Sequence, residues 1–517
     1  MGNSTRKEIF ILLLCLIIGF VLRFYKFDQK SLWIDEIHTY NDSRYDIKSQ
    51  IEFYRENPTY LQAPLFFVLT HFFYPFSNPE RDLRILPLIF GTLSVPLFYF
   101  LAKLFSPTIA LSCALSLTFM TYHISLSQEG RSYSLIMFLG LVGLYYFFKH
   151  LKTSKKRYLL WVALFYSISF ITSYSSIPFI FLSQLLWFYQ PEGDRPPPRF
   201  FSFVTLNGLI LLFCLPWILF LWFNFKSQTF TISLYSEDLG TFGNTLYGVL
   251  HDWLPNAPLV ILSGILWILF PIVSNKRNAI VLWAIFILPV GGLYLYCRVF
   301  NITHFITSRY FITFLPLFFI TLFLSLNAVE NRFEGLRKLK KLKLLFILFL
   351  ILSNLVILPF YYRSEKQDFR GLVRYLKGHL EEGDKVVVGS QVFIAGMLHY
   401  FEIYPKPNDR HYMISYSIVP DNEREFQVSL VMGDKHFTIT HSKTYWKQYL
   451  TERNRLWIVG VTKPIAKEIK AIPYTTLKGY FDGSFVNFNR FPTDASMYLF
   501  LWDPQSKDEK GIDISIE

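Results

Sequence analysis

The residues with the clearest chemical potential are two adjacent acids, Asp35 and Glu36, in the stretch SLWIDEIHTY. They are flanked by Trp33, Ile34 and Ile37, and such residues are typical of the boundary between membrane and water. In a helix, adjacent side chains point about 100° apart, so the two carboxylates are expected to face different surroundings. One could face a reaction cavity while the other pairs with an arginine. A solvated acidic loop or a helix cap is the alternative.

Arginines in three other stretches suit related chemistry. Arg131 lies in QEGRSYSL, Arg84 in RDLRILPLIFG, and Arg309 in HFITSRYFITFLP. A guanidinium binds phosphate through two N–H groups and keeps its charge, so each of these arginines suits the phosphate of a lipid. The alternative is that Arg131 and Arg84 are ordinary anchors at the membrane interface. His304, in the third stretch, is more often a packed or solvated histidine than a ligand.

Together these groups indicate one kind of reaction, provided that they lie on one side of a membrane. The substrate would be a lipid phosphate that stays in the bilayer, and a carboxylate would deprotonate an acceptor that arrives from outside. The sequence contains no Gly-rich phosphate loop, no His-Glu metal helix and no nucleophile elbow.

The composition is that of a membrane protein. Of 517 residues, 52% are hydrophobic, 19% are aromatic and only 17% are charged, whereas a soluble chain carries about 25% charged residues. The net charge is +13, but the basic residues cluster between apolar runs, as topology signals do, so nucleic-acid binding is not predicted. The four cysteines fall in or beside apolar runs and predict neither disulfides nor a metal site. The first apolar run, residues 9–22, is interpreted as a retained anchor.

Eleven membrane spans are predicted from apolar runs of about 20 residues. Their centres lie near residues 16, 95, 116, 140, 167, 181, 211, 266, 288, 317 and 353. Lysine and arginine collect in alternate connections throughout, for example at Lys149–Arg157 and Leu336–Lys343. This alternation predicts a cytoplasmic N-terminus and a C-terminus on the outer side of the cell (inner) membrane.

Three segments are therefore expected outside the membrane: residues 24–83, 224–256 and 363–517. The first contains YDIKSQIEFYRE, residues 45–56, where Ile47, Ile51 and Tyr54 are expected on one face of an interfacial helix. The chain thus divides into a membrane module, residues 1–362, and an extracytoplasmic mixed α/β domain, residues 363–517.

Periodicity and turns give this last domain its predicted elements. They are a helix over residues 369–380 and strands at residues 385–390, 456–461 and 497–502.

The same residues carry a family resemblance. SLWIDE followed by APLFFVLTHFF, residues 63–73, resembles the signature of the GT-C glycosyltransferases, among them the protein O-mannosyltransferase-like enzymes and the lipid A aminoarabinose transferase. The similarity continues through residues 84–103, SQEGRSYSL, LPW at residues 215–217 and SRYFITFLPL at residues 308–317. It covers roughly residues 1–365 in order, and the tail from residue 367 is similar to the outer domain of bacterial members.

The resemblance implies a GT-C fold and transfer of a sugar from a polyprenyl-phosphate donor to a lipid, glycan or protein acceptor. It places Asp35 at the reaction centre, as base or acceptor-orienting group, and Arg131 on the donor phosphate. Transfer would invert the anomeric carbon, and Glu36 would orient or pair. Arg84 and Arg309 are further candidates for phosphate binding, and the remaining site candidates are Gln62, Gln128, Tyr133, His304 and Tyr310.

One departure concerns metal binding. Relatives have His-Pro-Pro or Glu-Lys-Pro-Pro where this chain has Gln62-Ala63-Pro64. Because glutamine does not titrate and is a poor metal ligand, no obligatory metal is predicted, with a divalent ion as the alternative. Two other functions stay open: a transporter or flippase for lipid-linked sugars, and a non-catalytic subunit of glycan assembly. The sugar and the acceptor are not specified by the sequence.

Overall fold

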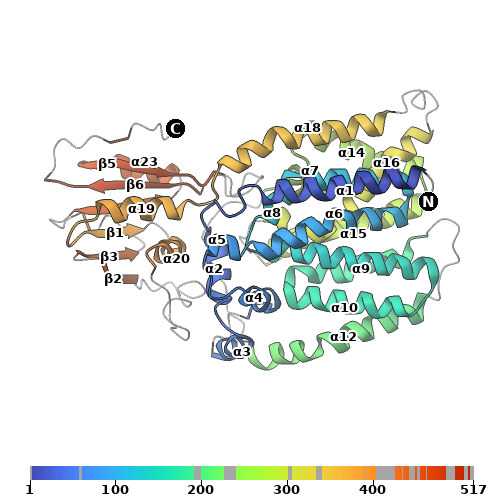
Figure 1. The fold of residues 1–517 in the computed structure, drawn as a ribbon, viewed down its shortest axis with the longest axis horizontal. Coiled ribbons are helices and arrows are strands. Elements are labelled where there is room, and N and C mark those ends of the chain that lie inside the picture. Colours follow the sequence, from blue (N-terminus) through green and yellow to red (C-terminus); the bar gives the residue numbers. More distant parts are fainter. Residues whose placement is uncertain are drawn as a thin grey trace.

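The computed structural model describes most of the chain. The described ranges are 3–56, 61–190, 199–225, 240–300, 306–332, 341–388, 391–402, 426–432, 435–441, 447, 449–450, 455–461, 463–484, 495–505 and 511–512. Long helices run side by side at one end of the molecule, and a sheet lies at the other end (Figure 1). The N-terminus lies at the end of the helices that is far from the sheet.

The helical part follows the predicted apolar runs, and each of the eleven predicted centres falls within a helical segment. These segments are α1 Asn3–Phe24, α6 Ile85–Phe105, α7 Ala110–Phe119, α9 Tyr133–Thr153, α10 Arg157–Thr172, α11 Ile177–Leu182, α12 Arg199–Asn224, α14 Ala257–Val273, α15 Lys276–Val299, α16 Leu315–Arg332 and α18 Leu342–Arg363. Among the described residues, six helices are long and apolar enough to cross a membrane, or up to eight if each bent pair is one span. The chain is thus a multi-pass membrane protein, and the count of eleven stays a prediction.

The third predicted span is bent. It consists of η1 Pro107–Ile109 with α7, and then α8 Thr121–Ser127, which is rotated by 60° at Met120. A break of this kind frees backbone carbonyls that a membrane helix must satisfy internally. The guanidinium of buried Arg23 provides the missing donors, because it donates to the carbonyls of Leu117 (2.8 Å) and Thr118 (3.3 Å). It also contacts His123 Nδ1 at 2.8 Å.

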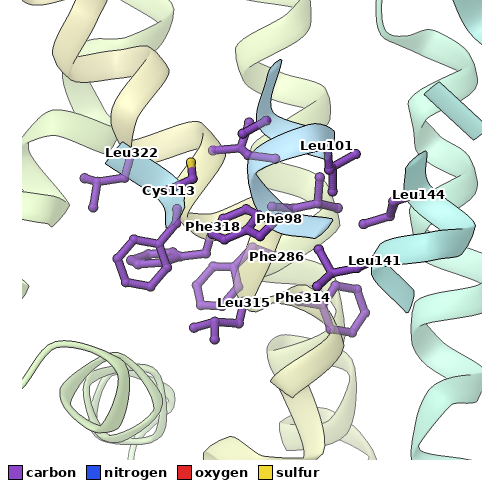
Figure 2. Packing of buried hydrophobic residues seen from close by; sticks show 14 of the residues in the cluster. Phe98, Leu101, Cys113, Leu141, Leu144, Phe286, Phe314, Leu315, Phe318 and Leu322 are labelled. Atoms are coloured by element: carbon purple, nitrogen blue, oxygen red, sulfur yellow. The ribbon is translucent and has the colours of Figure 1, made fainter. Parts of the chain in front are cut away.

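The helices pack around a core of large apolar side chains that point toward one another from several helices (Figure 2). The contributing side chains include Phe98 and Leu101 of α6, Cys113 of α7, Leu141 and Leu144 of α9, Phe286 of α15, and Leu315, Phe318 and Leu322 of α16. Close approach of α6 to α8 requires Gly91, because a Cβ there would lie 2.1 Å from Ser127 Oγ. This packing fixes the direction in which α8 leads toward residues 128–131.

Short helices follow α1 at the end of the bundle that faces the sheet (Figure 1). They are α2 Ile34–Asp42, α3 Ile47–Glu56, α4 Leu65–His71 and α5 Pro79–Asp82. The predicted helix over residues 45–56 is confirmed as α3, but its buried residues are Gln50, Phe53 and Tyr54, while Ile47 is exposed. The three residues expected on one face therefore do not share one environment.

The C-terminal part is a six-stranded mixed sheet, which confirms the predicted α/β character. The strands are β1 Lys385–Val388, β2 Phe426–Met432, β3 Lys435–His441, β4 Leu456–Val461, β5 Thr475–Phe481 and β6 Met497–Trp502, in the order β2-β3-β1-β4-β6-β5. β1 is parallel to β3 and β4, and the other pairs are antiparallel. The helices of this part are α19 Phe369–His379, α20 Gln391–Tyr400 and α23 Lys463–Lys470.

Helix α2 lies between the membrane helices and this sheet domain (Figure 1). Leu32, Ile37 and Tyr40 belong to the same buried apolar cluster as Phe369 and Met397 of α19 and α20. Because burial of large apolar side chains is the main favourable term in folding, the two parts are held together by a shared core rather than by a surface contact.

Candidate active site around Asp35

The two acids at the start of α2 face different surroundings, as predicted for helix neighbours. The Asp35 side chain is 26% exposed, whereas that of Glu36 is 1% exposed. A buried carboxylate with partners cannot meet an acceptor from outside, so this difference singles out Asp35 as the accessible acid.

Glu36 forms a closed, buried ion pair with Arg84. Arg84 Nε donates to Glu36 Oε1 at 2.7 Å and Nη2 donates to Oε2 at 2.6 Å. The remaining guanidinium N–H groups donate to the carbonyls of Phe27, Lys30 and Ser31. All five N–H groups of Arg84 are thereby engaged within the protein. This differs from the expectation that Arg84 binds the donor phosphate, and it assigns Glu36 to pairing rather than to chemistry.

The same carboxylate holds the loop that carries Arg131. Glu36 Oε1 accepts from the backbone N–H of Gly130 at 2.6 Å. A Cβ at residue 130 would lie 2.9 Å from Leu83 Cβ and 3.2 Å from Glu36 Oε1, so only glycine allows this approach. Glu36 therefore joins α2, the start of α6 and residues 128–131.

We expect Arg84→Met to lower the stability of the protein by about 3–5 kcal/mol, since it leaves Glu36 buried without its cation. Thermal unfolding in detergent measures this, with Arg55→Met, at an exposed position in the last turn of α3, as the matched control. An unchanged Tm combined with a weaker apparent affinity for the donor would instead assign Arg84 to the phosphate.

Asp35 is surrounded by two of the predicted arginines. Arg309, in η4 Ser308–Phe314, places Nη1 3.4 Å from Asp35 Oδ2. Arg131 Nη1 donates to the backbone carbonyl of Asp35 at 3.1 Å and contacts Thr39 Oγ1 at 3.2 Å. The carboxylate of Asp35 thus forms one ion pair, with Arg309, at a distance of 3.4 Å. Arg131 is held on α2 through the Asp35 carbonyl and Thr39, and not through the Asp35 carboxylate.

Several buried N–H groups beside Asp35 have no hydrogen-bond partner among the described residues. They are Arg131 Nε, Arg309 Nε and Trp33 Nε1, together with Arg309 Nη1, whose ion-pair contact with Asp35 at 3.4 Å is not a hydrogen bond. Buried N–H groups without a hydrogen-bond partner are energetically costly and uncommon in native proteins. A cluster of them is typical of a site that binds a ligand with several hydrogen-bond-accepting oxygens, such as a phosphate. The Arg309 guanidinium is also held between aromatic rings, 5.2 Å from the centroid of Trp33 and 5.8 Å from that of Tyr133.

The charges determine the ionisation of Asp35. Burial alone would raise its pKa, but the positive charges of Arg309 and Arg131 outweigh burial, so the pKa of Asp35 lies below its usual value. His38, one turn further along α2, is neutral at neutral pH, because burial lowers its pKa to about 4 against the attraction of Asp35. Asp35 is therefore an anion throughout the physiological range.

The other predicted site residues divide into three groups. Tyr133 lies in the site beside Arg309. Gln128 instead links α1 to α18: its Nε2 donates to the carbonyls of Arg23 and Tyr25, and its Oε1 accepts from Tyr361. Gln62 is exposed, Tyr310 packs partly buried against the bundle core, and His304 lies outside the described residues.

Sequence reasoning missed three residues of the site. Trp33, Glu129 and Lys366 lie together: Lys366 Nζ is 2.6 Å from Glu129 Oε2 and 4.5 Å from the ring centroid of Trp33. The sequence indicated Trp33 and Glu129 only as residues close to Asp35 and Arg131 along the chain, and it gave them no role of their own. No local pattern indicates Lys366, which is 237 residues away from Glu129 along the chain.

Two comparisons with known proteins bear on this arrangement. The family model described as dolichyl-phosphate-mannose-protein mannosyltransferase matches residues 62–222 of the 517. That segment includes Arg84 and Arg131 and begins after Asp35. No curated protein matches the sequence.

Two solved structures of ArnT from Cupriavidus metallidurans match almost the whole chain. The apo structure has a TM-score of 0.50 at 9% identity and covers 97% of this chain and 98% of that one. The structure bound to undecaprenyl phosphate has a TM-score of 0.52 at 10% identity, covering 97% and 99%. The chain has a GT-C fold. The family model and this fold match together confirm the resemblance to the GT-C glycosyltransferases. The fold match covers both the membrane helices and the C-terminal sheet domain.

Among the described residues, no group of three or more His, Cys, Asp or Glu side chains is arranged to hold a metal ion. The neighbourhood of Asp35 instead combines one accessible carboxylate with arginines, which suits binding of an anion.

Proposed function

We propose that the protein transfers a sugar from a polyprenyl-phosphate donor to an acceptor at the outer face of the membrane. The observation that carries the proposal is the group of unpaired N–H donors on Arg131 and Arg309 beside the accessible carboxylate of Asp35. The family model and the fold match to a structure bound to undecaprenyl phosphate support the same class of donor.

Arg131 and Arg309 would hold the donor phosphate. A phosphodiester carries one negative charge, and the phosphate that leaves carries nearly two at neutral pH. Fixed N–H donors that are already oriented stabilise this added charge in the transition state without reorganising, which is the most effective form of electrostatic catalysis. Neither arginine can lose its proton, so their contribution does not depend on pH in the physiological range.

Asp35 would act on the acceptor. In a single inverting displacement, a hydroxyl or amine of the acceptor forms a bond to the anomeric carbon while the bond from that carbon to the phosphate oxygen breaks. The acceptor's proton passes to the Asp35 carboxylate, and the polyprenyl phosphate leaves with the bonding electrons. With its lowered pKa, Asp35 is a weak base in the ground state, so it accepts the proton late and first orients the acceptor.

The proposed topology places this site outside the cytoplasmic membrane. Residues 1–362 would form the catalytic membrane module, with a cytoplasmic N-terminus, and residues 363–517 the extracytoplasmic domain. The position of the short helices α2–α5 at the sheet end of the bundle, away from the N-terminus, is consistent with this arrangement (Figure 1).

Transfer can be tested with purified protein in lipid nanodiscs, radiolabelled polyprenyl-phosphate sugars and envelope fractions as acceptors. We expect label to move from the donor to a glycolipid, glycan or protein, and mass spectrometry of a deletion strain should show the acceptor without its sugar. Movement of labelled donor across vesicles without any transfer would instead identify a flippase.

We also expect dialysis against EDTA to leave the transfer rate unchanged. The neutral amide of Gln62, which is exposed, stands where relatives have His or Glu, and amides bind transition metals weakly. The rate is measured before and after chelation and after adding Mg²⁺, Mn²⁺ or Zn²⁺. Loss of activity that one of these ions restores would contradict the expectation.

A further inference from the structure

The segment that joins the last membrane helix to the sheet domain lies against the start of α2. After α18 ends at Arg363, Glu365 Oε2 accepts from the backbone N–H of Ser31 at 3.1 Å. The carbonyl of Ser364 accepts from buried Lys30 at 2.8 Å. The C-terminal part therefore contacts the chain immediately before Asp35, although more than 300 residues separate the two in sequence.

Gln367 in this segment caps the helix that carries Asp35. The first N–H groups of a helix have no partner within it and need one elsewhere. In α2, the N–H of Ile34 donates to Gln367 Oε1 at 3.0 Å, and the N–H of Trp33 donates to the carboxylate of Glu36 at 3.4 Å. The orientation of Asp35, the next residue, thus depends on a side chain from beyond the last span.

Lys366 neutralises a buried carboxylate beside Arg131. Its Nζ lies 2.6 Å from Glu129 Oε2, and the two side chains are 13% and 2% exposed. Glu129 precedes Arg131 by two residues, and its charge contributes to raising the pKa of Arg131 against the burial that lowers it. Without Lys366, Glu129 would be a buried anion two residues from Arg131, and its charge acts on the guanidinium groups of both Arg131 and Arg309.

Lys366 also sets the charge of the site. Asp35 and Glu129 are negative, and Arg131, Arg309 and Lys366 are positive, so the set carries one net positive charge. That charge balances a phosphodiester. Without Lys366 the set would be neutral before the donor binds, and binding would leave an uncompensated anion in a largely buried place.

We propose that the C-terminal domain completes the donor site through Lys366, a positioning residue that holds Glu129 away from Arg131 and so leaves Arg131 available to the donor phosphate. This inference rests on the proposed function. Gln367 supports the same arrangement by capping α2.

Three variants of the full chain test the proposal. Lys366→Met should raise the donor KM by roughly tenfold or more, with a smaller change in kcat, because Glu129 then competes with the phosphate for Arg131. Lys366→Arg should retain most of the affinity. In Lys366→Met combined with Glu129→Gln, the competing anion is gone, so the donor KM should return toward the wild-type value. Lys447→Met, which removes a lysine from an exposed pair with Glu468 at 2.8 Å, is the matched control.

Isothermal titration calorimetry of polyprenyl phosphate binding to the purified variants gives a second measurement, which does not depend on turnover. Equal donor KM and affinity in wild type and Lys366→Met would overturn the inference, as would a loss in Lys366→Met that Glu129→Gln does not reverse. A wild-type protein that neither transfers sugar nor binds polyprenyl phosphate would instead contradict the proposed function itself.

Discussion

Asp35→Asn is expected to lower kcat for sugar transfer by roughly 10³-fold while the protein stays folded. Asparagine keeps the size and polarity of the side chain but cannot take up the acceptor's proton or carry the charge that orients it. The neighbouring pair of Glu36 with Arg84 does not involve the Asp35 side chain, so the start of α2 should remain in place.

The measurement compares kcat, donor KM and Tm of the variant with those of wild type. Glu52→Gln, an exposed acid on α3 in the same segment between α1 and α6, is the control and should behave as wild type. Full activity in Asp35→Asn would remove this residue from the mechanism. An inactive variant with a lowered Tm would show that Asp35 supports folding instead.

The acidic side of the pH profile provides an independent check. Because Arg309 and Arg131 hold the pKa of Asp35 below its usual value, the carboxylate stays charged as the pH falls toward that value. We expect kcat/KM to be lost only below the usual pKa of an aspartate, and in Arg309→Gln the acidic limb should move to higher pH. A limb that does not move would mean that a different group titrates.

Arg131→Ala is expected to lower kcat/KM for the donor by roughly 10²- to 10³-fold, whereas Arg131→Lys should retain a measurable part of the activity. The guanidinium is fixed by the Asp35 carbonyl and Thr39, and its Nε has no hydrogen-bond partner among the described residues. Lysine preserves the charge but loses the planar fork that binds both the protein and a phosphate.

Kinetics at varied donor concentration and calorimetry with polyprenyl phosphate measure this effect. Arg157→Ala, at the exposed first residue of α10, is the matched control. Equal loss in the alanine and lysine variants would show that the fork geometry, rather than charge, is essential. No loss in either would assign the phosphate to other residues.

Much of the architecture could be predicted because it depends on local patterns. Apolar runs indicated the positions of the membrane helices, and short apolar runs at Lys385–Val388, Leu456–Val461 and Met497–Trp502 indicated three strands. The length and hydropathy of an apolar run do not, however, indicate whether the helix bends, as the third predicted span does between α7 and α8. The break at Met120 depends on Arg23, which lies in another helix and satisfies the freed carbonyls.

The roles of the charged residues were harder to predict than their presence. The sequence places both Arg84 and Arg309 at the predicted outer start of a span and offers no reason to give them different roles. The structure separates them by their partners: Arg84 is saturated by Glu36 and backbone carbonyls, while Arg309 keeps unpaired N–H groups among the described residues. Contacts between distant segments leave no periodicity, and so Lys366 and Gln367 could not be found.

The cap that Gln367 provides to α2 has a consequence for how the protein is made. Ile34 and Gln367 are separated by 333 positions. A ribosome that adds about 5–20 residues per second needs roughly 20–70 s to pass from one to the other. The nascent chain thus spends most of its synthesis in the membrane with the helix of Asp35 lacking its cap and with Glu129 lacking its lysine. A chain released before Gln367 would possess membrane spans but would lack the cap of α2 and the cation that neutralises Glu129. We therefore expect synthesis beyond this residue to be required for the site to assemble.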